Sequence, residues 1–155
     1  MIRVLVADDH HLVRTSIVHL LNAEKDINVV GEAADGEEAI AQTRRLNPDV
    51  VVMDIRMPGI GGLEATRKIR RLTSDIRILV LTAFIEEAFA QRLLEAGAHG
   101  FISKGSQHDE MVKAIRAVFA GQRFVSPEIA QRLVLSRIDH EENPFDQLSQ
   151  RELQV

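Results

Sequence analysis

The sequence contains no cysteine, no tryptophan and no tyrosine among its 155 residues. Without cysteine the chain forms no disulfide bond, and it has no thiolate for nucleophilic catalysis or metal binding. Without tryptophan, neither folding nor ligand binding can be followed through intrinsic tryptophan fluorescence. The sequence also has no Walker A, HExxH or GxSxG motif, so the usual signals of a P-loop nucleotide site, a zinc protease or an α/β-hydrolase are missing.

An excess of positive charge and a long apolar run are missing as well. The net charge of -4 argues against a free-standing nucleic-acid binder, because contact with phosphates needs a basic face. No apolar run reaches the length of a transmembrane helix, and residues 2–7 are too few for the apolar core of a signal peptide. The composition, 45% hydrophobic and 27% charged, is typical of a soluble globular domain. We therefore expect a cytoplasmic protein without membrane contacts.

Short apolar runs alternate with segments of helical periodicity along the first 121 residues. The apolar runs predict strands over 2–7, 27–33, 50–53, 76–81 and 99–103. The helical segments are 12–22, 37–46, 63–70, 86–96 and 111–119. Apolar runs bounded by turn residues are typical of buried strands in a parallel sheet. The alternation predicts an α/β fold with a doubly wound, five-stranded parallel sheet and helices on both faces.

The pattern changes after Gly121. Ser126 and Pro127 resemble a helix N-cap followed by proline at the first helical position, which predicts a linker helix through about Arg137. Residues 139–144 are polar and acidic, and 149–152 match a capping box, so a helix is expected to start there. We expect three parts: a domain at 1–121, a linker at 122–147, and the start of a second domain, cut off after a few residues, at 148–155.

Polar side chains stand at the carboxyl ends of four of the predicted strands. They are Asp8 and Asp9, Asp54, Thr82, and Lys104. In a parallel sheet these ends lie at one edge, where ligands of such folds bind. Three carboxylates placed together repel one another and need a cation, and all-oxygen ligation suits Mg²⁺ or Mn²⁺. A lysine and a hydroxyl can hold a phosphoryl group, and one carboxylate can accept it as a nucleophile.

These residues, in this order, resemble the receiver domain of two-component response regulators. The resemblance runs from Val4 to about Gly121 and rests on Asp8-Asp9, Asp54 with Met57-Pro58-Gly59, Thr82-Ala83 and Lys104. The segments 4–10, 57–64 and 148–153 are similar to the NarL/FixJ subfamily and, within it, to GacA/UvrY-like regulators. The resemblance implies the strand order 2-1-3-4-5 of the flavodoxin-like or CheY-like fold. It also implies that a LuxR-type helix-turn-helix domain follows from Leu148.

The resemblance implies roles for the residues at the strand ends. Asp54 would accept a phosphoryl group from a sensor histidine kinase. Asp9, Asp54 and the backbone carbonyl of Arg56 would ligate Mg²⁺, with Asp8 acting partly through water. Thr82 would bond a phosphoryl oxygen, and Lys104 would pair with its charge.

The resemblance also implies a conformational switch and its outputs. Phe101 stands at the position of the family's aromatic switch residue, which turns inward when Thr82 moves. The partners implied are the kinase, a second receiver in a homodimer through the receiver helices, and DNA, reached only through the missing C-terminal domain. Phosphoryl transfer would be self-catalysed, which makes the protein a switch and not an enzyme.

The sequence departs from the usual receiver pattern at two positions. Gly105 follows the lysine where proline is common, so a cis peptide bond there is left open. The switch residue is Phe and not Tyr, so Phe101 has no hydroxyl to bond outward.

Arg56 and Phe84, each two residues after a site residue, are bulky enough to crowd an attacking water. We therefore expect a long-lived phosphoryl group and slow autodephosphorylation.

Other interpretations compete with each assignment. Read alone, Asp54 is a loop-capping acid, Asp8-Asp9 a helix cap, Thr82 a strand residue, Lys104 a surface lysine and Phe101 a core aromatic. His10 and His11 beside two acids suggest a transition-metal site, but adjacent histidines point in different directions. A haloacid-dehalogenase-like phosphatase would need an acid at position 56, which is an arginine. A pseudo-receiver that only binds partners would not need the complete acidic set.

Overall fold

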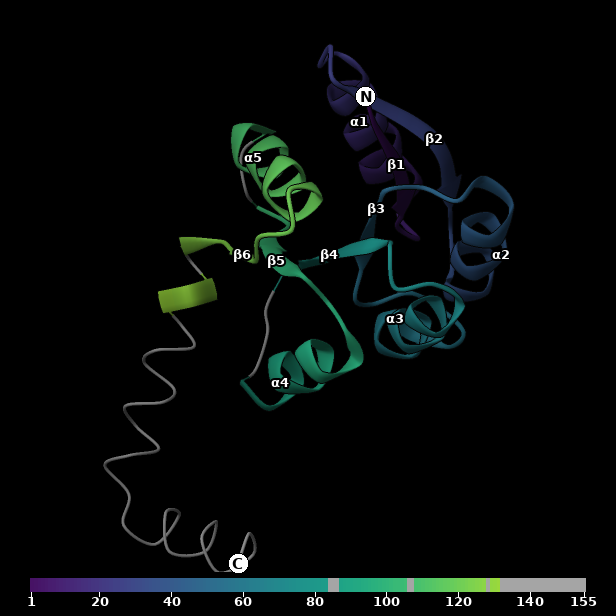
Figure 1. Ribbon diagram of the computed structural model, residues 1–155, viewed down its shortest axis with the longest axis vertical. Coiled ribbons are helices and arrows are strands. Elements are labelled where there is room, and N and C mark those ends of the chain that lie inside the picture. The colour runs from purple at the N-terminus through teal and green to yellow at the C-terminus, as the bar shows by residue number, and fades with distance from the viewer. Residues whose placement is uncertain (84–86, 106–107, 128, 132–155) are drawn as a thin grey trace, which may run out of the picture.

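A computed structural model describes residues 1–83, 87–105, 108–127 and 129–131 of the chain (Figure 1). The strands are β1 (Ile2–Ala7), β2 (Ile27–Ala33), β3 (Val50–Asp54), β4 (Arg77–Thr82), β5 (Gly100–Ser103) and β6 (Phe124–Val125). The helices are α1 (His11–Asn22), α2 (Gly36–Leu46), α3 (Gly61–Leu72), α4 (Glu87–Ala96) and α5 (His108–Phe119). All strand pairs are parallel, so the doubly wound α/β fold predicted from the alternation is confirmed.

The sheet is buried on both faces by two groups of helices. On one face α1 and α5 pack against side chains such as Val50, Val52 and Leu81. On the other face α2, α3 and α4 pack against Val51 and Met53, among others. Because successive residues of a strand point to opposite faces, both positions of every pair must be apolar, which explains the unbroken apolar run of β3. Asp54 is the point where that run meets the edge of the sheet.

The sheet has six strands, so the predicted count of five is wrong. The order is β2-β1-β3-β4-β5-β6, which keeps the expected 2-1-3-4-5 and adds a strand beyond β5. β6 pairs with β5 through Gly100↔Phe124 and Phe101↔Val125. A Cβ at Gly100 would lie 2.6 Å from the carbonyl oxygen of Phe124, so this close approach requires glycine. A strand of two residues is too short to produce a recognisable pattern in sequence.

The helix ends follow the turn residues. The side chain of Asp35 accepts a hydrogen bond from Glu38 N at 2.7 Å and begins α2. Gly97 has a φ of 107° and closes α4, as expected for a glycine after a helix. Ser126 also acts as predicted: its Oγ accepts from Ile129 N at 3.4 Å, and residues 127 and 129–131 are helical.

Two expectations about the chain after β5 have different outcomes. The peptide bond between Lys104 and Gly105 is trans, since the described residues contain no cis peptide. The rest of the predicted linker helix, the acidic segment 139–144 and the capping box at 149–152 lie outside the described residues, so the three-part division stays a prediction. None of the helices in the described part of the chain is long and apolar enough to cross a membrane.

Candidate functional site

The carboxyl ends of β1, β3, β4 and β5 bring the predicted site residues to one edge of the sheet. The register pairs Ala7 with Met53 and Thr82 with Ser103, so Asp8, Asp54 and Lys104 each stand at or just beyond a strand end. Ion pairs then join residues that are far apart in sequence. The Nζ of Lys104 lies 2.9 Å from Asp54 Oδ2 and 3.6 Å from Asp8 Oδ2. The convergence expected from the strand pattern is therefore present.

Asp54 is a nearly buried carboxylate held at both oxygens. Oδ2 accepts a hydrogen bond from Lys104 Nζ at 2.9 Å, and Oδ1 accepts one from the backbone N–H of Arg56 at 3.2 Å. Burial raises the pKa of Asp54, and the nearby charge of Asp8 raises it further. The lysine and the Arg56 amide lower the pKa, but the net direction is upward. The carboxylate is fixed in position while its negative charge is incompletely compensated.

Asp8 has an exposure of 0%, and one of its oxygens accepts no hydrogen bond from the part of the chain that the structure describes. Oδ1 accepts from the backbone N–H of His10 at 2.9 Å. Oδ2 has no hydrogen-bond partner among the described residues, and its nearest cation is Lys104 at 3.6 Å. A buried carboxylate oxygen in this situation is destabilised unless a cation reaches it. Asp8 thus provides an observation, independent of sequence, that the edge is suited to a bound cation.

The donor set at this edge fits a hard divalent cation. Carboxylate oxygens of Asp8, Asp9 and Asp54 and a ring nitrogen of His10 lie within 4.8 Å of one another. One lysine cannot neutralise three carboxylates, so a divalent cation would remove the remaining repulsion. The described residues therefore form an acidic cluster compatible with a metal site.

Lys104 is held in its charged form by the same carboxylates. Partial burial lowers its pKa, but the hydrogen bond that Lys104 donates to Asp54 and the charges of Asp54 and Asp8 outweigh that effect, so the pKa is raised. Its backbone N–H donates to the carbonyl of Thr82 at 2.9 Å, which ties the end of β5 to the end of β4. Lys104 is a fixed cation beside Asp54 and not a solvated surface lysine.

Thr82 and Phe101 occupy buried positions next to this edge. Thr82 ends β4 and is 2% exposed. Phe101 is fully buried in the core cluster that also contains Val80 and Ile129, so its ring lies inward in this structure. Its backbone carbonyl accepts from Ser126 N at 2.9 Å. The roles of Thr82 and Phe101 in switching stay predictions. The role of the Arg56 backbone carbonyl as a metal ligand also stays a prediction. Phe84 lies outside the described residues.

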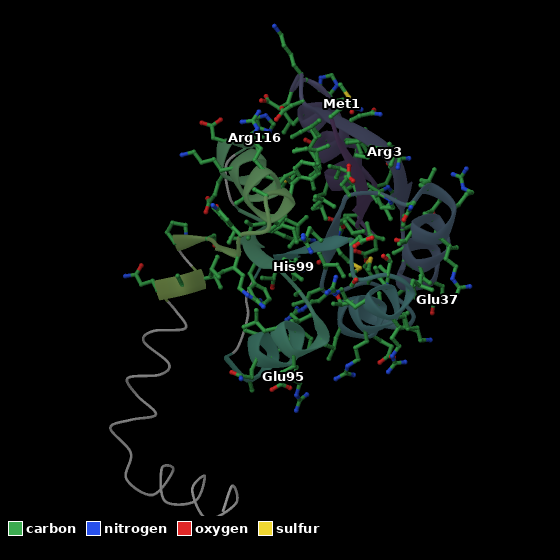
Figure 2. The ribbon with its side chains drawn as sticks, in the orientation of Figure 1. Met1, Arg3, Glu37, Glu95, His99 and Arg116 are labelled. Carbon is green, nitrogen blue, oxygen red and sulfur yellow. The ribbon has the colours of Figure 1, made fainter. Side chains whose placement is uncertain are left out.

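The loop after Asp54 is closed tightly against α2 and α3. Gly62 N donates to the carbonyl of Ile55 at 3.0 Å, and a Cβ at Gly62 would lie 2.8 Å from Ile55 Cα. Glu37, labelled on α2 in Figure 2, accepts from the backbone N–H of Ile60 at 3.2 Å. The glycine-rich segment therefore serves a compact turn that carries residues 55–57 past Asp54.

Sequence reasoning missed one residue that holds the acidic pair. Arg14 on α1 donates from Nη1 to the backbone carbonyl of Asp8 at 2.7 Å and from Nε to Glu32 on β2 at 3.0 Å. An arginine on a helix gives no sequence signal for such a contact. The expected helix cap is also different: α1 starts after His10, which makes no side-chain cap, while Asp8 binds the His10 amide.

Comparison with known proteins agrees with this geometry. The family described as "Response regulator receiver domain" matches residues 4–116. The response regulator GacA of Pseudomonas viridiflava is 54% identical over 157 residues, covering 100% of this chain and 73% of that protein. UvrY of Escherichia coli K12 is 51% identical, with 100% and 72% covered.

Similarity to solved structures extends to the fold. A crystal structure of a LuxR-family two-component response regulator from Aurantimonas sp. SI85-9A1 has a TM-score of 0.84 at 43% identity. The match covers 89% of this chain and 99% of that one. The chain belongs to the response regulator receiver domain family and is similar to the response regulators GacA and UvrY.

Proposed function

We propose that Asp54 accepts a phosphoryl group from a sensor histidine kinase and that this event switches the protein. The observation that carries the proposal is the hydrogen bond of 2.9 Å between Lys104 Nζ and the buried Asp54 carboxylate, at an edge that also holds Asp8 and Asp9. A carboxylate that accepts a phosphoryl group needs a fixed cation nearby and acids that can bind a metal ion, because both neutralise the charge of the phosphoryl oxygens. Both are available at the ends of neighbouring strands.

The chain's own residues would position the reacting groups. An Asp54 carboxylate oxygen forms the new P–O bond, and the bond from phosphorus to the kinase imidazole nitrogen breaks, its electron pair staying on that nitrogen. Lys104 and the hydroxyl of Thr82 hold the phosphoryl oxygens. Asp8, Asp9, Asp54 and the backbone carbonyl of Arg56 would hold Mg²⁺ or Mn²⁺. When bound, the cation would neutralise charge on the phosphoryl oxygens.

The partners follow from the switch and from the surface beside it. An apolar groove between α1 and α5 is lined by Leu12, Leu20 and Met111 and reaches Lys104, with Leu12 82% exposed. We favour this face for kinase contact or for a homodimer through α1 and α5 over one through α4 and α5. DNA would be reached only through a LuxR-type domain after Leu148. A cytoplasmic location remains a prediction.

Two rival functions are less well supported. A haloacid-dehalogenase-like phosphatase would place an acid at position 56, where the chain has Arg56 with an exposed side chain. A pseudo-receiver would lack part of the acidic set, whereas Asp8, Asp9 and Asp54 all lie at the edge. We therefore propose a switch whose phosphoryl transfer is self-catalysed, and not an enzyme acting on other molecules.

Intact-protein mass spectrometry after incubation with acetyl phosphate and Mg²⁺ tests the proposal. The wild type is expected to gain one phosphoryl mass, and Asp54→Ala none. Chelation of the metal with EDTA should abolish the gain in the wild type. A phosphoryl mass that persists in Asp54→Ala, with the variant folded by circular dichroism, would refute Asp54 as the acceptor.

A further inference from the structure

His10 lies among the carboxylates at the metal-binding edge, whereas His11 does not. His10 Nδ1 is 3.2 Å from Asp9 Oδ1 and 3.4 Å from Asp8 Oδ1. His11 Nδ1 instead lies 3.1 Å from Arg14 Nη2. The two histidines diverge because His10 has an extended backbone at the helix N-cap (φ −86°, ψ 105°), while α1 begins at His11. Adjacency therefore excludes a shared site for the pair but not a role for His10 alone.

The separations between His10 Nδ1 and the two carboxylates are compatible with ligands around one cation. Two ligands at right angles, each about 2.1 Å from a metal, are about 3.0 Å apart. The contacts of His10 Nδ1 to Asp8 and Asp9 lie close to that spacing. The hydrogen bond of 2.9 Å between His10 and Asp8 uses the backbone N–H of His10, so the ring nitrogen Nδ1 faces both carboxylates at ion-pair distance.

A second observation points to a ligand at the same place. Asp8 is fully buried, and its Oδ2 has no hydrogen-bond partner among the described residues. Asp8 and His10 belong to the same set of potential ligand atoms. His10 itself is 65% exposed, so its ring has room to adjust to an ion. Asp8 therefore offers an oxygen donor, and His10 a nitrogen donor, to the same cluster.

We propose that His10 Nδ1 is an additional ligand of the metal centre and shifts its preference from Mg²⁺ toward first-row transition cations such as Mn²⁺ and Co²⁺. The inference rests on the metal site of the proposed function. Mg²⁺ prefers oxygen ligands and retains water, whereas imidazole nitrogen is favoured by transition cations, more strongly by Co²⁺ than by Mn²⁺. Replacing one water by an imidazole therefore favours these cations selectively.

Electron spin echo spectroscopy of bound Mn²⁺ tests the nitrogen ligand directly. The full chain, stripped of metal with a chelator and loaded with Mn²⁺, should show ¹⁴N coupling from imidazole. His10→Ala should lose that coupling. His11→Ala is the matched control, because it removes the neighbouring imidazole and should keep the coupling. Absence of ¹⁴N coupling in the wild type, or its persistence in His10→Ala, would overturn the proposal.

Calorimetric titration with Mg²⁺, Mn²⁺ and Co²⁺ tests the preference. His10→Ala is expected to weaken Co²⁺ binding by about tenfold and Mn²⁺ binding less, with Mg²⁺ affinity changed by less than about twofold. An equal change for all three cations would mean that His10 acts only through charge, and the proposal would fall. Asp9→Asn should weaken the binding of all three cations. If it weakens none, the metal site of the proposed function fails as well, which separates the two claims.

Discussion

The Asp54 carboxylate is the residue at which opposing electrostatic effects meet. Burial and the charge of Asp8 raise its pKa, while Lys104 and the Arg56 amide lower it. The phosphoryl group that we propose for Asp54 would bring more negative charge to a site that already has more carboxylates than cations among the described residues. Lys104 remains protonated beside this negative charge, because the pKa of Lys104 is raised. The repulsion among the carboxylates and the compatibility of the cluster with a divalent cation thus have the same origin.

The lifetime of the phosphoryl group depends on how easily water reaches it. Arg56 follows Asp54 by two residues, and its backbone N–H is bonded to the acceptor carboxylate. We expect Arg56→Asn to speed dephosphorylation on the order of tenfold, equal to about 1.4 kcal/mol of barrier, because the smaller side chain leaves more room for water. Loss of acetyl-phosphate-derived mass with time measures the rate. Arg56→Lys, which keeps a long side chain, is the control, and equal rates in all three proteins would contradict the expectation.

His99, which directly precedes β5 and is labelled in Figure 2, makes stability depend on pH. Its Nδ1 accepts a hydrogen bond from Ile78 N at 3.1 Å, so protonation there breaks a contact. Burial first, and then the charges of Arg70, Arg77 and Arg123, lower its pKa to about 4 from an ordinary value of 6.5. The unfolded chain therefore binds a proton more readily than the folded one. Stability is fully present above pH 6.5 and falls as the pH drops toward 4.

Urea unfolding at pH 7.5 and pH 5 measures this contribution. The wild type is expected to lose about 1 kcal/mol more than His99→Asn between the two values, a figure reduced from the full shift because the side chain is partly exposed. Asparagine keeps an acceptor for the Ile78 amide but does not titrate. The same loss in both proteins would remove His99 as the source.

At the scale of elements, Arg14 connects α1, β1 and β2 behind the acidic pair. Its guanidinium donates to the Asp8 carbonyl and pairs with Glu32, and its side chain is only 13% exposed. We expect Arg14→Ala to weaken Mg²⁺ binding by about tenfold, because outer partners that orient ligands commonly have effects of that size. Titration calorimetry gives the affinity. Glu32→Gln, which retains an oxygen acceptor, should have a smaller effect; equal Mg²⁺ affinity in Arg14→Ala and wild type would contradict the role.

The predictable features of the chain are those set by local pattern and parallel topology. The apolar run before Asp54 and the lysine after β5 were enough to predict that Asp54 and Lys104, fifty positions apart, lie close together. Parallel strands end at a common edge, which is why this prediction was possible. Arg14 escaped prediction since its partners are a backbone carbonyl and a residue on another strand. β6 escaped because two residues carry no periodicity. The argument that adjacent histidines point in different directions excludes a metal site shared by His10 and His11. It does not address His10 alone, whose extended backbone at the helix N-cap separates it from His11.

At the scale of the whole molecule, Phe101 and the helical turn after Ser126 belong to one packed unit. Phe101 accepts a backbone hydrogen bond from Ser126, which also caps the helical turn that contains residues 127 and 129–131. Ile129 of that turn is 3% exposed and lies in the same core cluster as Phe101. Figure 1 shows this turn beside β6, at the edge of the sheet formed by β5 and β6. We expect a movement of β5 to be transmitted to this turn through these contacts.

Truncation of Ile129 is expected to weaken this connection without affecting the phosphorylation site. Ile129→Ala should lower the free energy of unfolding by about 2 kcal/mol, since it removes buried aliphatic contacts. Amide exchange over 124–131 should rise, and its response to acetyl phosphate should be lost, while phosphoryl transfer to Asp54 is retained. Gln131→Ala, at an exposed position of the same turn, is the control and should behave as the wild type. If Ile129→Ala keeps both the exchange protection and its response to phosphorylation, the signal leaves the receiver by a route other than the packing of Ile129 near Phe101.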